Sequence, residues 1–174
     1  MKYLYTPHDI AVFFVASDLT VSYERSVLHN IWINEKDSIP SKFRKDEMYF
    51  RRMVYFELSK LTGFLDDVDE LNLLMRDTDH AINIDGTINE QGITESYFKI
   101  IKLKLTYLPN KEFCKIKLRR LLKVFGYKRR SAHLVNGIQR TLRALKLKTY
   151  LRGYVPCDIA KIDIDDVIMI RLSL

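Results

Sequence analysis

The sequence is poor in the residues that build metal, disulfide and phosphate-binding sites. It has only two cysteines among 174 residues, Cys114 and Cys157, and they form neither a Cys-x-x-Cys pair nor a zinc-site spacing. Its six glycines are scattered, so no glycine-rich phosphate loop is present. Its four histidines include no His-x-x-x-His pair. We therefore predict reduced thiols, no cofactor, no metal site and no catalytic residue.

Long apolar runs are also missing. No stretch of about 18 uncharged apolar residues occurs, so we expect no membrane span and no membrane partner. The short apolar run at residues 10–16 lies between Asp9 and Asp18 and is preceded only by Lys2, unlike a signal peptide. Hydrophobic residues still make up 47% of the chain, which is enough for a packed core. We expect a globular, cytoplasmic protein.

Positive charge is concentrated in the C-terminal half. Residues 1–98 contain 10 Lys and Arg against 17 Asp and Glu, whereas residues 99–174 contain 19 against 5. Between Lys99 and Arg152, Glu112 is the only acid among 17 basic residues. Such a field attracts polyanions, which indicates a nucleic-acid-binding surface. The alternative is a solvated basic face, or one that docks onto the acidic half of the same chain.

The N-terminal half has mainly helical patterns. Thr6 and Pro7 predict a helix start, with Thr6 as N-cap and Pro7 at the first helical position, and the helical segment runs through Leu19. Residues 38–41 predict a break before a long helix that spans residues 43–61 and ends at Gly63. Further predictions are a helix at 66–75, a hairpin at 83–88 and a helix from 94 to about 108.

Pro109 and Asn110 mark the predicted domain boundary. We expect an acidic, mainly helical domain at residues 1–108 that serves dimerisation or partner binding, and a basic domain at residues 109–174. The basic domain is predicted to begin with a helix at 112–125 that contains Cys114 and ends at Gly126. A basic turn at 127–130 follows, and then Ser131 is the expected N-cap of a second helix at 132–146.

The second helix is amphipathic. Leu134, Ile138, Leu142 and Leu145 recur at steps of four, four and three, which predicts one buried stripe. The opposite side carries side chains that can hydrogen-bond base edges: Asn136, Gln139, Arg140 and Arg143. The side chains expected to hold phosphates are Lys115, Arg119, Arg120, Lys123, Lys128, Arg129, Arg130 and Arg152.

Extended segments follow this helix. Residues 147–151 leave it as a strand, and the Ile- and Val-rich stretch at 159–172, with a turn at Asp165 and Asp166, predicts a second strand. Two helices joined by a short turn and followed by a small β-hairpin form a winged helix-turn-helix. The predicted fold class is therefore mainly α (α+β), with an N-terminal helical part and a C-terminal winged helix-turn-helix.

The same segment resembles a known class of modules. The run at 126–131, the apolar positions Val135, Ile138 and Leu142, the exit at 145–149 and the later 162–164 resemble small winged-helix modules of bacterial defence and restriction-type proteins. The resemblance implies DNA binding by this part of the chain. It departs at residues 145–147, where a glycine is expected at the helix end.

These observations predict a regulatory or accessory protein that binds duplex DNA in preference to RNA: a transcriptional regulator, a replication factor or a defence-system subunit. One alternative is a metal-dependent nuclease that arranges Asp85, Glu95 and Lys99 around a divalent cation. Another is an assembly or RNA-binding protein whose basic face docks an acidic partner.

Overall fold

The computed structural model of the chain describes residues 4–62 and 90–173. The predicted helix at 66–75, the predicted hairpin at 83–88 and Gly63 lie outside the described residues. The chain divides into two compact units, Met1–Asp79 and His80–Leu174. Within the described ranges, no helix is both long enough and apolar enough to cross a membrane.

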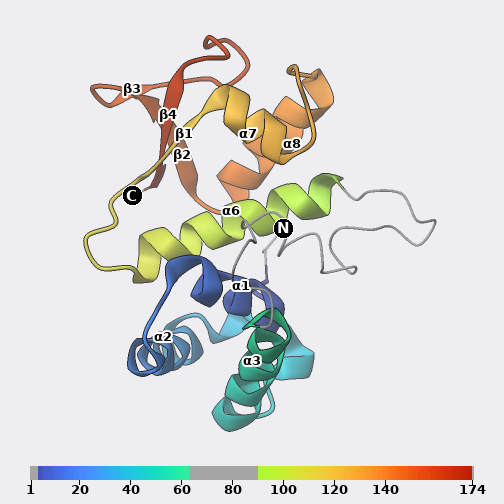
Figure 1. Ribbon diagram of the computed structural model, residues 1–174, viewed down its shortest axis with the longest axis vertical. Coiled ribbons are helices and arrows are strands. Elements are labelled where there is room, and N and C mark those ends of the chain that lie inside the picture. The colour runs from blue at the N-terminus through green and yellow to red at the C-terminus, as the bar shows by residue number, and fades with distance from the viewer. Residues whose placement is uncertain (1–3, 63–89, 174) are drawn as a thin grey trace, which may run out of the picture. The chain divides into compact units, whose positions relative to one another are not determined.

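The first unit is helical. Its elements are α1 (Pro7–Ser17), α2 (Val21–Asn34), two single-turn 3₁₀ helices at Lys36–Ser38 and Ser41–Phe43, and α3 (Glu47–Thr62) (Figure 1). Helix α1 packs along α3, and its apolar side chains are almost completely buried. Phe13, Phe14, Phe50 and Val54 form the centre of this core, where burying each large side chain stabilises the fold by roughly 1.5–3 kcal/mol.

The start of α1 confirms the prediction from Thr6 and Pro7. The Asp9 N–H donates to Thr6 Oγ1 at 3.2 Å, and the Thr6 N–H donates to Asp9 Oδ2 at 2.9 Å, so the two residues form a reciprocal capping box. The end of α1 differs from the prediction. Asp18 adopts a left-handed conformation with φ 48°, and Thr20 caps a separate helix α2.

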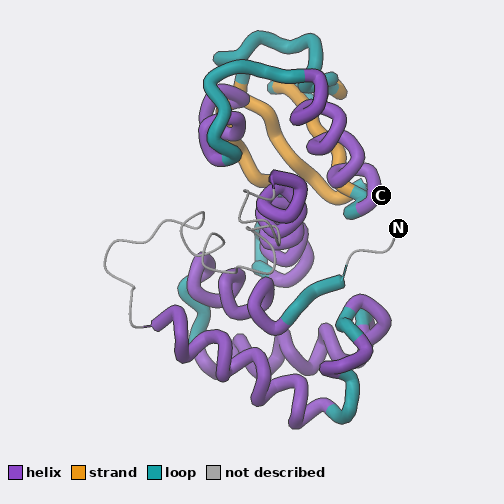
Figure 2. The backbone as a smooth tube through the Cα atoms, turned by 90° about the vertical axis from the view of Figure 1, so that its right-hand side faces the viewer, coloured by secondary structure: helices purple, strands orange, loops and turns teal. Residues whose placement is uncertain are grey.

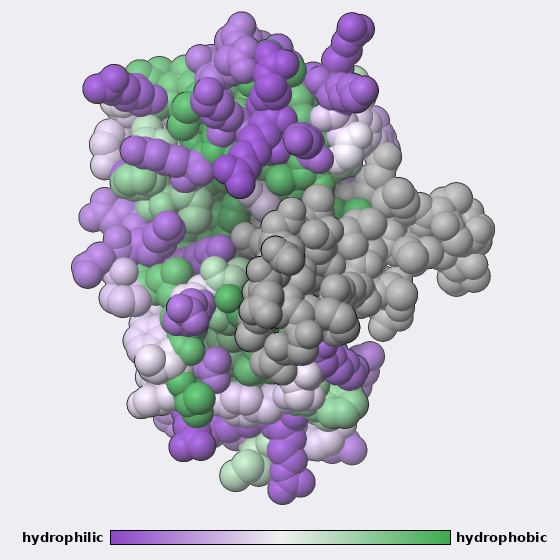
Figure 3. Space-filling view, in the orientation of Figure 1, coloured by the Kyte–Doolittle hydropathy of each residue, from purple (hydrophilic) through white to green (hydrophobic). Residues whose placement is uncertain are grey.

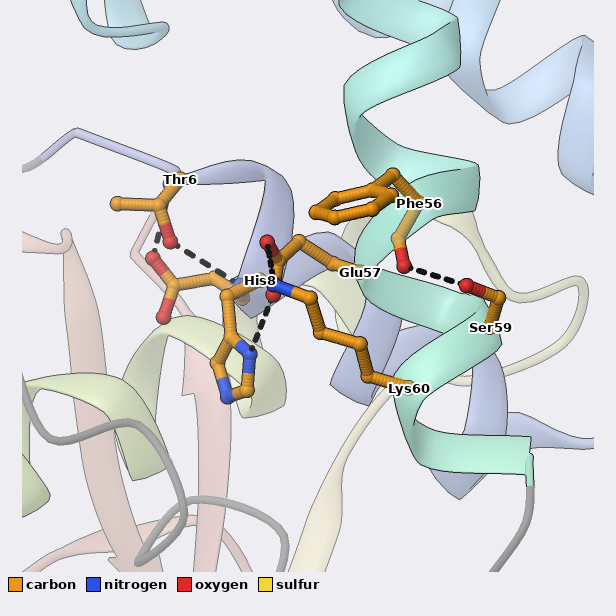
Figure 4. A network of polar contacts seen from close by, with 7 residues as sticks. Thr6, His8, Phe56, Glu57, Ser59 and Lys60 are labelled. Atoms are coloured by element: carbon orange, nitrogen blue, oxygen red, sulfur yellow. Dashed lines mark hydrogen bonds and ion pairs between the residues drawn. The ribbon is translucent and has the colours of Figure 1, made fainter.

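Polar contacts also join α1 to α3. His8 Nδ1 lies 3.4 Å from Glu57 Oε2, and Lys60 Nζ donates to Glu57 Oε1 at 2.8 Å (Figure 4). The close-up shows both basic side chains directed at the same carboxylate, while the Ser59 hydroxyl donates to the Phe56 carbonyl on the same helix. Two basic side chains of the first unit therefore contact one carboxylate, that of Glu57.

The second unit combines helices with an antiparallel sheet. Its elements are α6 (Glu90–Tyr107), β1 (Cys114–Lys117), α7 (Leu118–Val124), α8 (Ala132–Ala144), β2 (Leu147–Leu151), β3 (Val155–Pro156) and β4 (Val167–Leu172). The four strands have the order β1-β4-β2-β3. Helices α6 and α8 pack on each other, with α8 alongside β2 and α6 against β4 (Figures 1 and 2).

The α+β class is confirmed, but two details of the prediction are wrong. Residues 114–117 form a strand and not the first turn of a helix, because Cys114 pairs with Ile170 and Lys117 with Val167 across the sheet. Cys114 is consequently half-buried in β1. The sheet has four strands where the sequence predicted a two-stranded hairpin.

The domain boundary also differs. The sequence predicts units at residues 1–108 and 109–174, whereas the first compact unit ends at Asp79. Helix α6 accounts for the difference, because it packs on α8 and β4 and so belongs to the core of the second unit.

Candidate nucleic-acid interface

Helix α8 has one buried and one exposed side, as predicted. The Ser131 hydroxyl accepts a hydrogen bond from the Leu134 N–H at 3.2 Å, which satisfies an amide at the start of the helix. The predicted stripe is buried, with exposed fractions between 0% and 6% for Leu134, Ile138, Leu142 and Leu145. This stripe fixes which side of α8 faces the core and which faces outward.

The exposed arc of α8 presents Asn136, Arg140 and Arg143. The side chains of Asn136 and Arg140 make no hydrogen bond or ion pair with the rest of the described chain. The Arg143 Nε contacts only the Gln139 carbonyl, one turn back, at 3.4 Å. Because α8 contains no acidic residue, the cations on this arc have no compensating carboxylate on their own helix.

Gln139, the fourth predicted base-facing residue, is differently placed. Its Nε2 donates to Asp158 Oδ1 at 2.7 Å, and the same carboxylate oxygen accepts the Ala160 N–H at 2.9 Å. Gln139 is half-buried as a result. Its amide therefore anchors the segment after β3 to α8 in this structure.

The turn between α7 and α8 is set by Gly126. Its φ of 82° allows the Gly126 N–H to donate to the Lys123 carbonyl and the Tyr127 N–H to donate to the Leu122 carbonyl. This pair of hydrogen bonds is a Schellman motif, which ends α7 and redirects the chain. Three basic residues follow at 128–130, and they do not share one role.

Lys128 and Arg129 are exposed, whereas Arg130 turns inward. Arg130 Nη1 donates to the carbonyls of Ile159 and Ile162 at 3.1 and 2.5 Å. A charged donor bound to two carbonyls ties the turn to the segment that precedes β4. Arg130 is thus held by the protein's own backbone.

The basic residues of α7 also differ in whether their side chains are bound within the chain. Arg119 donates from Nε and Nη2 to the two oxygens of Asp165 at 2.8 and 2.7 Å, and this contact holds the pKa of Asp165 below its usual range. Arg120 and Lys123 are exposed and have no such partner among the described residues. Lys115 lies on β1, where its Nζ is 5.1 Å from the centre of the Phe113 ring.

The connection between β2 and β3 is a tight turn at residues 152–154. Gly153 and Tyr154 both have positive φ values, 81° and 63°, and Arg152 is exposed in this turn. Lys148, which is not among the predicted phosphate-binding residues, is exposed in β2 between inward-facing Leu147 and Thr149. Successive side chains of a strand point to opposite faces, so the alternation of these three residues in the sequence could have identified Lys148 as exposed.

A groove of about 480 Å³ lies between the C-terminal half of α8, β2 and residues 156–159. Arg143 and Lys148 line it together with Cys157 and Asp158. Burial raises the pKa of the Cys157 thiol, so the reactive thiolate is disfavoured at neutral pH. The sequence does not predict this groove, because its walls come from segments that are separated along the chain.

Figure 3 shows strongly hydrophilic side chains gathered over the C-terminal unit, in line with its excess of Lys and Arg. Among the residues that the structure describes, no three His, Cys, Asp or Glu side chains are grouped as metal ligands. Of the proposed nuclease residues, Asp85 lies outside the described residues. Glu95 accepts a hydrogen bond from Gln91 at 2.8 Å, and Lys99 is only 4% exposed.

Comparison with known proteins found no matching family model, no similar curated protein and no similar solved structure.

Proposed function

We propose that the second unit is a winged helix-turn-helix that binds duplex DNA, with α8 as the helix that enters the major groove. The order α7, turn, α8 and then antiparallel strands supports this proposal. The observation that carries it is the exposed arc of Asn136, Arg140 and Arg143 on α8, whose two arginines have no carboxylate partner among the described residues.

The chemistry of this arc suits base edges. Arginine binds the O6 and N7 atoms of guanine with two hydrogen bonds, and asparagine binds the N6 and N7 atoms of adenine in the same way. The major groove is about 12 Å wide and admits one α-helix. Asn136, Arg140 and Arg143 would read bases, while Gln139 would need to leave Asp158 in order to do so.

The phosphate contacts would come from exposed cations of the second unit, which are Lys115, Arg120, Lys123, Lys128, Arg129 and Arg152. Arg119 and Arg130 are less suited to this role, because their guanidinium groups already bind Asp165 and two backbone carbonyls. The remainder of the chain would serve dimerisation or partner binding. The proposed role is that of a cytoplasmic regulator, replication factor or defence-system subunit.

The test is a fluorescence-anisotropy titration of labelled duplex DNA at several salt concentrations, with single-stranded DNA and RNA as competitors. Neutralising about six phosphates predicts a slope of roughly −5 for log K against log salt concentration. Absence of binding at low salt would reject DNA binding and favour an acidic protein partner. A preference for RNA would support the RNA-binding alternative instead.

A further inference from the structure

The sheet of the second unit has an apolar side and a side that is aromatic and basic. Ile168 and Ile170 of β4 are fully buried among the helices. Successive strand residues point to opposite sides, and directly paired residues point to the same side. The register therefore places Lys115, Met169 and Tyr150 in one row across the other side of the sheet.

The next row is centred on Arg171, which pairs with Lys148. The Arg171 guanidinium lies 4.1 Å from the centre of the Tyr154 ring and 5.2 Å from that of Phe113, and its Nη2 donates to the Tyr154 hydroxyl at 2.6 Å. The Tyr150 ring meets Tyr154 edge to face at 6.5 Å. Three aromatic rings and one guanidinium thus form a continuous cluster.

Tyr154 is the most accessible part of this cluster. It is 59% exposed although Arg171 covers part of its ring, and its φ of 63° is a backbone conformation that tyrosine rarely adopts. The guanidinium contact and the hydrogen bond from Arg171 hold the ring in this position. The ring is therefore both exposed and fixed before any ligand binds.

The charge on this side of the sheet is positive. Lys115, Lys117 and Lys148 are exposed. Two acids lie near these cations: Glu112, whose Oε2 is 3.8 Å from Arg171 Nη2, and Asp165, which is bound mainly by Arg119 and whose pKa the charge of Lys117 also helps to lower. Lysines interleaved with exposed aromatic rings suit a strand of nucleic acid, because the rings stack on bases and the ammonium groups neutralise phosphates. Stacking requires bases that are not paired in a duplex, so the ligand differs from that of α8.

We propose that this outer sheet face, made of Phe113, Lys115, Lys148, Tyr150, Tyr154 and Arg171, binds single-stranded DNA. The choice of DNA over RNA rests on the proposed function, since Lys148 and Tyr150 also line the groove beside Arg143 and so connect this face to the duplex-binding arc. An unpaired strand that continues from a duplex on α8 would reach Tyr154 along this path.

The experiment measures anisotropy of labelled oligothymidylate, the matching oligouridylate and a blunt duplex with the full chain and its variants. Tyr154→Ala is expected to raise the Kd for oligothymidylate about tenfold, because one stacked base contributes that much binding, and to change the duplex Kd by less than about twofold. Tyr154→Trp should restore single-strand binding. The matched control is Phe56→Ala, which removes an exposed ring with a lysine over it on α3 of the first unit.

Three results would overturn the inference: no binding of oligothymidylate at low salt, wild-type binding by Tyr154→Ala, or equal losses for duplex and single strand. A tighter complex with oligouridylate would overturn the assignment to DNA. Arg140→Ala separates the two proposals, since it should weaken the duplex complex and leave oligothymidylate binding intact. Loss of duplex binding alone therefore rejects only the role of α8.

Discussion

The two units differ in how far their basic side chains are paired with carboxylates. In the first unit, Glu47 binds both His29 and Arg51, and Glu57 binds both His8 and Lys60. In the second unit, Arg119 and Arg171 have carboxylate partners, whereas exposed cations such as Lys128, Arg129 and Arg140 have none among the described residues.

This difference shows why net charge alone does not define a binding surface. An exposed ion pair contributes little to stability and offers little free charge to a ligand. An unpaired cation retains its field and can release counterions from a polyanion on binding. The surface of the second unit is therefore a candidate site because some of its cations are unpaired among the described residues, and substitutions can separate these cations from the paired ones.

The largest effect is expected on the exposed arc of α8. Arg140→Ala and Arg143→Ala should each weaken binding to a specific duplex by about 1–3 kcal/mol, because each removes hydrogen bonds to base edges. Titrations with the specific site and a scrambled duplex measure the loss. Arg52→Ala, an exposed arginine on α3, is the matched control and should bind like the wild type. Wild-type affinity in both α8 variants would show that α8 is not the recognition helix.

Substitutions at the adjacent residues Arg129 and Arg130 should affect different properties of the protein. Arg130→Ala removes the donor that binds two backbone carbonyls and should lower the free energy of unfolding by about 2 kcal/mol, measured by urea denaturation. Arg129→Ala should leave stability unchanged, weaken binding to all duplexes alike and reduce the salt slope by about 1. Equal stability of the two variants would contradict the inward placement of Arg130.

A smaller effect is expected at Arg119, which Asp165 holds through two hydrogen bonds. Asp165→Asn removes a negative charge and releases Arg119, so it should raise duplex affinity by about threefold at low salt. Arg119→Ala should reduce affinity less than Arg120→Ala does, because Arg120 has no such partner in the part of the chain that the structure describes. A larger loss from Arg119→Ala would mean that the ion pair with Asp165 opens when DNA binds.

The sequence was sufficient where the signals are local. Ser131 and the stripe from Leu134 to Leu145 lie within fifteen consecutive residues, and the structure confirms both the cap and the buried side. The end of α8 has no glycine, and the neighbouring residue Lys146 adopts the conformation that a glycine usually takes there. Lys146 takes the left-handed conformation there, with φ 56°, and its N–H donates to the Arg143 carbonyl.

The sequence was insufficient where the deciding contact is distant. The sequence predicts a helix where strand β1 forms, because the partner strand β4 lies some fifty residues later. The roles of Arg119, Gln139 and Arg130 depend on contacts with residues 158–165, which are separated from them by 19 to 46 positions. Composition identifies the basic residues, but only the fold shows which of them are already bound within the chain.

The smallest effect concerns two glutamates of the first unit, whose pKa values move in opposite directions. Burial raises the pKa of Glu24 above its ordinary value of 4.5, and the nearby Tyr55 hydroxyl partly opposes this increase. The ionised carboxylate therefore destabilises the fold as the pH rises above 4.5. The hydrogen bond with His29 lowers the pKa of Glu47, so its stabilising contribution is present above pH 4.5 and is lost as the pH falls through the lowered pKa. At pH 7, Glu24→Gln should therefore raise Tm and Glu47→Gln should lower it, each by less than about 3 °C. Both differences should shrink toward pH 4.

Thermal unfolding followed by circular dichroism at the two pH values measures both variants. A lower Tm for Glu24→Gln at pH 7 would mean that the contact with Tyr55 outweighs the cost of burying the charge. The buried carboxylate of Glu24 would then be stabilised by a partner within the first unit.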